Sequence, residues 1–335
     1  MVSLPMIFGA AFSMLLAVGV PAAMLCVLRR KTGGGGRAAL VGAACFVLFA
    51  LVLEQLLHAL VLPHVQGNVW LYCLYGCLAA GVFEETGRLA GLSLLCRGKH
   101  ADPSARTGLG YGIGHGGIES ILVGGLNMAV GLYCLIVVRA GGVLPASLIA
   151  AGDSAASTQA GLLWLAGVER MLALAGQLAL SVIVWLAVTG RARFRWYFGA
   201  IGLHALLDVP AALGQTGVLT NMFVLEGIVA AEAAMLCLLA WSLYHRSEGR
   251  AVTPLPAAGP ALQSAVPAVR PLPAAEISAP EMPAEAPAPD AAAADAAAPE
   301  APAAQTPESA PASQASQTPP ASAQSGSAAP DIRQL

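Results

Sequence analysis

Charged residues are scarce in this chain: Asp, Glu, Lys and Arg make up 11% of its 335 residues. Soluble globular domains typically carry about 25% of these residues. Aromatic residues are also few, at 6%, so aliphatic residues supply most of the 57% hydrophobic content. The composition therefore excludes an ordinary soluble domain and is typical of a membrane protein with several spanning helices.

Several functional motifs are also missing. The net charge of −2 comes without any basic stripe, so no nucleic-acid partner is expected. The seven cysteines show no Cys-x-x-Cys spacing, and their odd number within apolar stretches predicts neither a disulfide framework nor a cysteine zinc site. No His-Glu-x-x-His motif is present, which excludes a zinc site of that kind.

Long apolar stretches dominate residues 1–246. A membrane-spanning helix needs about 20 mostly apolar residues, and several stretches meet this requirement. They are 4–28, 38–62, 69–95, 108–138, 161–189, 197–214 and 218–244. We therefore predict an all-α fold, a polytopic membrane helical bundle of about seven transmembrane helices. The fourth stretch is long and rich in glycine, which predicts a break near Gly116.

Residues 247–335 differ in composition from the rest of the chain, being rich in Pro, Ala, Ser and Gln. Such a segment buries too little apolar surface to offset the entropy lost on ordering it. We expect a disordered C-terminal tail in the cytoplasm.

Basic residues mark alternate ends of the predicted spans. They follow the first, third, fifth and seventh spans, at Arg29, Arg30, Lys31, Arg37, Arg97, Lys99, Arg106, Arg191, Arg193, Arg195, Arg246 and Arg250. The opposite loops contain only Arg139. Because cytoplasmic loops carry the excess of Lys and Arg, the N-terminus is predicted outside and the C-terminal tail inside the cell. The expected location is the cell membrane, crossed several times.

Three clusters of ionisable residues interrupt the predicted spans. Their members are Glu84, Glu85, Arg88, His115, Glu119, His204 and Asp208. Each lies about 9 to 13 residues from the nearest basic loop, which corresponds to a depth of roughly 13 to 20 Å. Residues four apart share a helix face, as His115 and Glu119 do. Because charged groups are costly in hydrocarbon, three clusters at one depth predict a functional site inside the bundle.

Two further pairs lie outside this layer. Glu54 and His58 are four residues apart on the second span, nearer its outer end. Glu169 and Arg170 adjoin on the fifth span. We interpret both as structural pairs.

The clusters resemble the motifs of a known family. Residues 81–88 read Gly-Val-Phe-Glu-Glu-Thr-Gly-Arg, similar to the Glu-Glu-x-x-Arg motif of the YhfC family of intramembrane peptidases. The likeness continues through residues 112–119, Glu169-Arg170, Ser181-Val182 and residues 204–210. It extends to the wider CAAX protease and bacteriocin-processing (CPBP) enzymes. In the fifth span, the chain has a glutamine at position 177 where the family usually has a histidine.

The resemblance implies a role for each residue. Glu84 would be the general base that activates a water, and His115 would hydrogen-bond the same water. His204 and Asp208 would stabilise the oxyanion or orient the substrate carbonyl. The second acid and the arginine of the first cluster would hold the Glu84 carboxylate in place. The full set of expected catalytic residues is Glu84, Glu85, Arg88, His115, Glu119, His204 and Asp208.

The metal requirement stays open at this point. His115, His204 and Glu84 form a ligand set of two imidazoles and one acid, which is found in catalytic zinc sites that keep an open position for water. Enzymes similar to this family are also described as metal-independent glutamic proteases. We therefore expect either no cofactor or a zinc ion at these three residues.

Together these observations predict an intramembrane endopeptidase, of glutamic or zinc type, that acts through a water activated by Glu84 and His115. The expected partners are the lipid bilayer and a membrane-embedded or lipidated peptide substrate. Two alternatives use the same buried groups: an ion- or proton-coupled transporter, and a catalytically silent membrane adaptor. No internal repeat typical of many transporters is evident. The sequence indicates no particular oligomeric state.

Overall fold

The computed structural model describes residues 2–97 and 100–248. These residues form helices, and no strand is present among them. In chain order the elements are α1 (Leu4–Thr32), α2 (Gly36–Leu48), the π-helical η1 (Phe49–Glu54), α3 (Gln55–Val65), α4 (Val69–Arg97), α5 (Ala105–Glu119), the π-helical η2 (Ser120–Gly125), α6 (Leu126–Arg139), the 3₁₀-helical η3 (Ala146–Leu148), α7 (Ile149–Ser157), α8 (Ala160–Val188), α9 (Arg195–Gln215) and α10 (Met222–Ser247). The predicted all-α fold is confirmed.

Within the described residues, six helical stretches are long and apolar enough to cross a membrane. They are Leu4–Thr32, Gly36–Val65, Ala105–Arg139, Ala160–Val188, Arg195–Gln215 and Met222–Ser247. The remaining predicted span coincides with α4. This helix has 29 residues, the same length as α1, but it contains the charged cluster of residues 84–88. The last span begins at Met222 instead of residue 218, and α7 was not predicted.

The predicted break near Gly116 is wrong. α5 continues through this residue as far as Glu119, and the departure from α-helical geometry comes later, in η2. A Cβ atom at Gly116 would lie 2.7 Å from Cβ of Gln177 on α8. Glycine at this position therefore permits close packing of α5 on α8, as small residues do between membrane helices.

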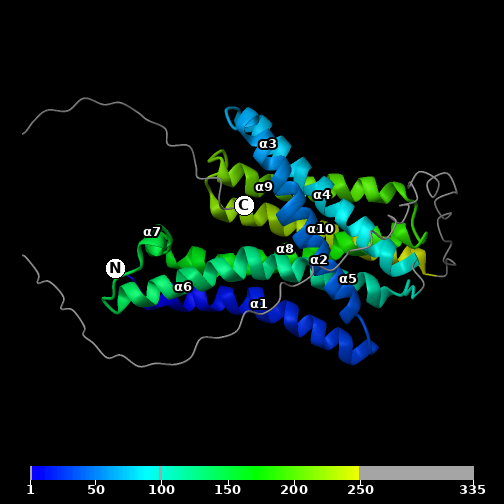
Figure 1. The fold of residues 1–335 in the computed structure, drawn as a ribbon, viewed down its shortest axis with the longest axis horizontal. Coiled ribbons are helices and arrows are strands. Elements are labelled where there is room, and N and C mark those ends of the chain that lie inside the picture. Colours follow the sequence, from blue (N-terminus) through cyan, green and yellow to red (C-terminus); the bar gives the residue numbers. More distant parts are fainter. Residues whose placement is uncertain (1, 98–99, 249–335) are drawn as a thin grey trace, which may run out of the picture. The chain divides into compact units, whose positions relative to one another are not determined.

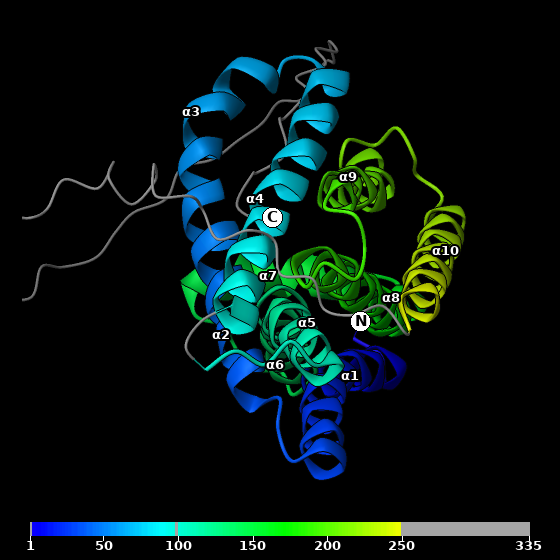
Figure 2. The same cartoon turned by 90° about the vertical axis from the view of Figure 1, so that its right-hand side faces the viewer.

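α8 is the central helix of the bundle (Figure 1, Figure 2). It contacts α1, α4, α5, α9 and α10. Most of its C-terminal half is buried, and Leu180, Ile183 and Val184 belong to the main hydrophobic core. Because α4, α5 and α9 carry the three ionisable clusters, their shared contact with α8 brings those clusters to one place.

α2 and α5 approach each other closely because glycine occupies both sides of the contact. A Cβ atom at Gly114 would collide with the backbone of Ala39, and a Cβ atom at Gly42 would collide with the backbone of Tyr111. The contact determines how near α5 can lie to α2. It therefore fixes the position of His115, which follows Gly114 directly in the sequence.

The basic loops meet at one end of the bundle. Arg97, at the end of α4, donates a hydrogen bond to the Val188 carbonyl at the end of α8, at 2.9 Å. Arg106 donates one to the Thr32 carbonyl at the end of α1, at 3.2 Å. The cytoplasmic location of this end stays a prediction. The tail was predicted to begin at residue 247, but Ser247 still belongs to α10; residues 249–335 lie outside the described residues.

Replacing Gly114 with alanine is expected to destabilise the protein. The added methyl group would overlap the Ala39 backbone, and overpacking of this kind costs about 1–3 kcal/mol. Gly227→Ala is the matched control, because a Cβ atom at Gly227 meets nothing within 4 Å. Thermal unfolding in detergent should give a lower midpoint for Gly114→Ala than for Gly227→Ala. Equal midpoints would contradict the close contact.

Candidate active site

α4 is held between two neighbours at the level of its charged cluster. A Cβ atom at Gly81 would lie 2.6 Å from the Ile201 carbonyl oxygen of α9. A Cβ atom at Gly87 would lie 3.0 Å from the Phe49 ring of η1. Because both glycines allow a neighbouring helix to approach the α4 backbone, the charged side chains of residues 84–88 are enclosed by the bundle.

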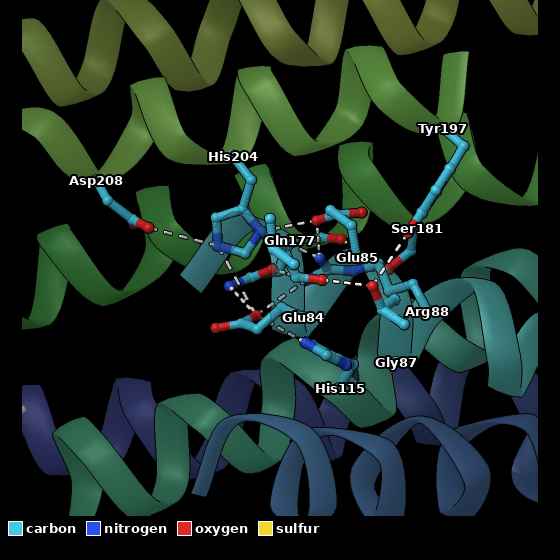
Figure 3. Close-up of polar contacts among 12 residues, drawn as sticks. Glu84, Glu85, Gly87, Arg88, His115, Gln177, Ser181, Tyr197, His204 and Asp208 are labelled. Atoms are coloured by element: carbon cyan, nitrogen blue, oxygen red, sulfur yellow. Dashed lines mark hydrogen bonds and ion pairs between the residues drawn. The ribbon is translucent and has the colours of Figure 1, made fainter. Parts of the chain in front are cut away.

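The Glu84 carboxylate is the centre of the site (Figure 3). Its Oε2 atom accepts a hydrogen bond from Nε2 of His115 at 2.9 Å and one from Nε2 of Gln177 at 3.3 Å. Nη2 of Arg88 lies 3.5 Å from the same oxygen, and Nε2 of His204 lies 3.8 Å from it. Side chains from α4, α5, α8 and α9 therefore converge on one carboxylate oxygen.

Arg88 is fully buried and is held by side chains of two helices. Its guanidinium pairs with Glu85 on its own helix and donates a hydrogen bond to the side-chain oxygen of Gln177 on α8. Its Nε donates to the Ser181 hydroxyl at 3.2 Å, and that hydroxyl donates to the Gln177 carbonyl at 2.8 Å. The guanidinium thus has little freedom to move away from Glu84.

His204 links the second acid to the exposed edge of the site. Its Nδ1 atom lies 2.7 Å from Oε1 of Glu85, so that nitrogen donates to the carboxylate. Its Nε2 atom faces Oδ2 of Asp208 at 3.7 Å and the Glu84 carboxylate. The Asp208 side chain is 36% exposed, compared with 10% for Glu84 and 2% for His204. Asp208 is therefore the most exposed of these three side chains and marks the edge of the site.

His115 is oriented mainly by packing. Its ring stacks on Tyr111 with centroids 5.8 Å apart and meets the Phe46 ring edge-on at 5.2 Å. The Tyr111 hydroxyl donates to the Gly87 carbonyl at 3.0 Å, which ties α5 to α4. Since a carboxylate only accepts, the His115 nitrogen that faces it carries the hydrogen.

The structure brings most of the predicted site residues together. Those in mutual polar contact are Glu84, Glu85, Arg88, His115, His204 and, at the edge, Asp208. Glu119 is separate: its buried Oε2 has no hydrogen-bond partner among the described residues. The contacts of Gln177 and Ser181 with Arg88 were not predicted. Their signal in the sequence was two polar residues four apart on an apolar helix.

A zinc ion was one of the two expectations for His115, His204 and Glu84. Among the described residues, no group of three or more His, Cys, Asp or Glu side chains is spaced to hold a metal ion. The Glu84 oxygen that faces both histidines accepts hydrogen bonds from His115 and Gln177 instead. A cation at this oxygen would also face the Arg88 guanidinium. The choice between no cofactor and a zinc ion at these three residues stays a prediction.

The fold and the site define a polytopic α-helical membrane protein whose interior holds a cluster of acids, histidines and one arginine. The model of the YhfC intramembrane metalloprotease family matches residues 12–229. With this match, the chain belongs to the YhfC family. The predicted resemblance to that family is confirmed, while the likeness to the wider CPBP enzymes stays a prediction.

A relative supports this membership. A Bacillus subtilis (strain 168) protein named "Uncharacterized membrane protein YhfC" is 33% identical over 250 residues. The aligned region covers 70% of this chain and 95% of that protein. No solved structure matches the chain.

Removing the Arg88 charge alone is expected to destabilise the protein strongly. Arg88→Met leaves Glu85 buried without its cation, and breaking a buried pair in this way typically costs about 3–5 kcal/mol. The double variant Glu85→Gln/Arg88→Met carries neither charge and should lose much less. Unfolding free energies of the wild type, Arg88→Met, Glu85→Gln and the double variant in mixed micelles measure the difference. A double variant as unstable as the sum of the two single variants would contradict the pairing.

Proposed function

We propose that this protein is an intramembrane endopeptidase that hydrolyses a peptide bond of a membrane-embedded or lipidated substrate. The observation that carries the proposal is the position of Glu84 between two histidines. Its Oε2 lies 2.9 Å from His115 and 3.8 Å from His204, on opposite sides in Figure 3. The description of the family as intramembrane metalloproteases supports a membrane protease.

Glu84 is the general base in this proposal. Its carboxylate takes a proton from a water molecule while the water oxygen bonds to the carbonyl carbon of the substrate. The carbonyl π electrons move to the carbonyl oxygen, which becomes a tetrahedral oxyanion. When the C–N bond breaks, these electrons return to the carbon, and protonated Glu84 gives its proton to the departing amine nitrogen.

His204 stabilises the oxyanion. Glu85 holds its Nδ1 atom, which leaves Nε2 directed toward the gap between Glu84 and Asp208. Nε2 lies 3.7 Å from Asp208 and 3.8 Å from Glu84, and a hydrogen on this nitrogen is the donor to the oxyanion. Removing one preorganised donor of this kind typically lowers kcat by about 100-fold or more.

The other residues position the reacting groups. His115 and Gln177 each donate a hydrogen bond to Glu84, and Arg88 places a positive charge 3.5 Å from its oxygen. These contacts keep the carboxylate ionised and restrict its rotation, so that it meets the water in one orientation. Asp208, at the exposed edge, is placed to orient the substrate.

The proposed steps run without a metal ion, because the donors around Glu84 are not spaced as a zinc ligand set among the described residues. The family's description names a metalloprotease and makes the opposite prediction. Metal removal is therefore part of the test.

Glu84→Gln is expected to abolish peptide cleavage, because an amide cannot take a proton from water; a lost general base typically lowers the rate about 100- to 10,000-fold. His204→Ala should lower it by about 100-fold or more. Asp153→Asn, at an exposed acid of α7, is the matched control and should cleave like the wild type. Mass spectrometry of a membrane-peptide library incubated with each purified protein in detergent measures the cleavage. A zinc chelator should leave the wild-type rate unchanged.

Each of the other outcomes would indicate a different function. Cleavage that survives both substitutions would rule out this site, and flux assays for a transporter would then come first. Cleavage lost with the chelator and restored by zinc would make the protein a metalloenzyme.

A further inference from the structure

A second polar cluster, formed by Glu54, His58 and Tyr75, lies outside the proposed catalytic centre. Glu54 and His58 are each 6% exposed, and Nε2 of His58 lies 3.3 Å from Oε1 of Glu54. Nδ1 of His58 lies 2.8 Å from the Tyr75 hydroxyl on α4. The pair predicted from spacing is confirmed, and the structure shows that it is buried against α4.

The arrangement of this cluster leaves part of Glu54 without a partner. Because a carboxylate only accepts, Nε2 of His58 carries the hydrogen that faces Oε1, and Nδ1 accepts from the Tyr75 hydroxyl. Oε2 of Glu54 accepts no hydrogen bond among the described residues. An ionisable group that is kept in an apolar helix at such cost is a candidate for function.

Two contacts define the register of this cluster along α4. The Phe49 ring lies against Gly87, and His58 bonds to Tyr75. The segment formed by η1 and α3 therefore runs antiparallel to α4, and Glu54 lies between these two contacts. This places Glu54 about one helical turn along α4 from the proposed base.

Glu54 and Asp208 flank the proposed base from two sides. Glu54 lies about one helical turn along α4 from Glu84, and Oδ2 of Asp208 lies 3.7 Å from the His204 nitrogen that faces Glu84. Glu54 ends η1 and Asp208 lies on α9, and both elements pack against α4. In Figure 2, α4 lies between the chain of α2 and α3 on one side and α9 on the other. An extended peptide that lies along α4 and leads to Glu84 would meet both acids.

On α4, two small residues precede Glu84 on the same helix face. Gly76, Ala80 and Glu84 follow each other at intervals of four and so form one row along the helix. A Cβ atom at Gly76 would meet nothing within 4 Å. The row is therefore open at Gly76, two helical turns from Glu84.

We propose that Glu54 and Asp208 accept hydrogen bonds from backbone N–H groups of an unwound substrate that lies along this row. The proposal rests on the peptidase function proposed above. A helical substrate must unwind locally before its peptide bond can reach Glu84, and backbone groups without partners are strongly unfavourable in the bilayer. Carboxylates on both sides of the row satisfy those groups, and His58 and Tyr75 hold Glu54 in position.

Binding of a synthetic peptide tests this site separately from cleavage. The probe has about 20 Ala and Leu residues with a central Gly-Gly pair, and thermophoresis measures its Kd for Glu84→Gln protein in detergent. Adding Glu54→Ala should weaken binding about tenfold or more, because a hydrogen bond to a charged acceptor is lost. Adding Gly76→Leu should weaken it by filling the row. Gly227→Leu, at an open position on α10, should leave the Kd unchanged.

Backbone esters in the probe distinguish a hydrogen bond from a structural effect. Each ester replaces one peptide N–H with an oxygen, and successive probes carry it at successive positions. At the position that meets Glu54, the ester should weaken binding to Glu84→Gln protein. It should cause no further loss once Glu54→Ala is added.

Other outcomes separate the two proposals. The binding site is wrong if the probe does not bind, if Glu54→Ala leaves the Kd unchanged, or if the ester and Glu54→Ala losses add at every position. A probe that binds with the expected dependence on Glu54, while the wild type cleaves no peptide, supports the binding site and overturns the peptidase mechanism.

Discussion

The buried Arg88 guanidinium is the interaction on which the rest of the site depends. A helix with two adjacent carboxylates inside an apolar bundle is costly unless a cation accompanies them. Arg88 supplies that charge one turn away, and Gln177 and Ser181 hold it there from α8. Glu85 in turn binds His204 of α9. One ion pair thus joins the three helices α4, α8 and α9.

This pairing gives the two neighbouring acids different environments. Glu85 is fully buried and pairs with both Arg88 and His204. Glu84 retains some exposure and faces the edge of the site near Asp208. Glu85 is therefore suited to a positioning role, while Glu84 is suited to meet water and substrate. Identical side chains take separate roles because of what surrounds each of them.

Glycines decide how closely the helices around this pair can approach. Gly81 and Gly87 admit α9 and η1 to the α4 backbone, and Gly114 and Gly116 bring α5 against α2 and α8. The sequence showed these glycines, but it did not show which helices they allow to approach each other. A break was predicted at Gly116, because glycine weakens an isolated helix. In the bundle the neighbouring helices provide the packing that keeps the segment helical, and the irregular turn falls at η2 instead.

The amino-acid sequence by itself determined the membrane class, the helices and the common depth of the ionisable groups. These depend on composition, on the length of apolar runs and on distance along a helix. Only the tertiary structure decided which groups touch. Glu119 shares a face with His115, yet its buried Oε2 makes no hydrogen bond within the described part of the chain, whereas Gln177 contacts both Glu84 and Arg88. Such contacts depend on the rotation of each helix about its axis and on the separation of neighbouring helices, which residues far apart in the sequence set together.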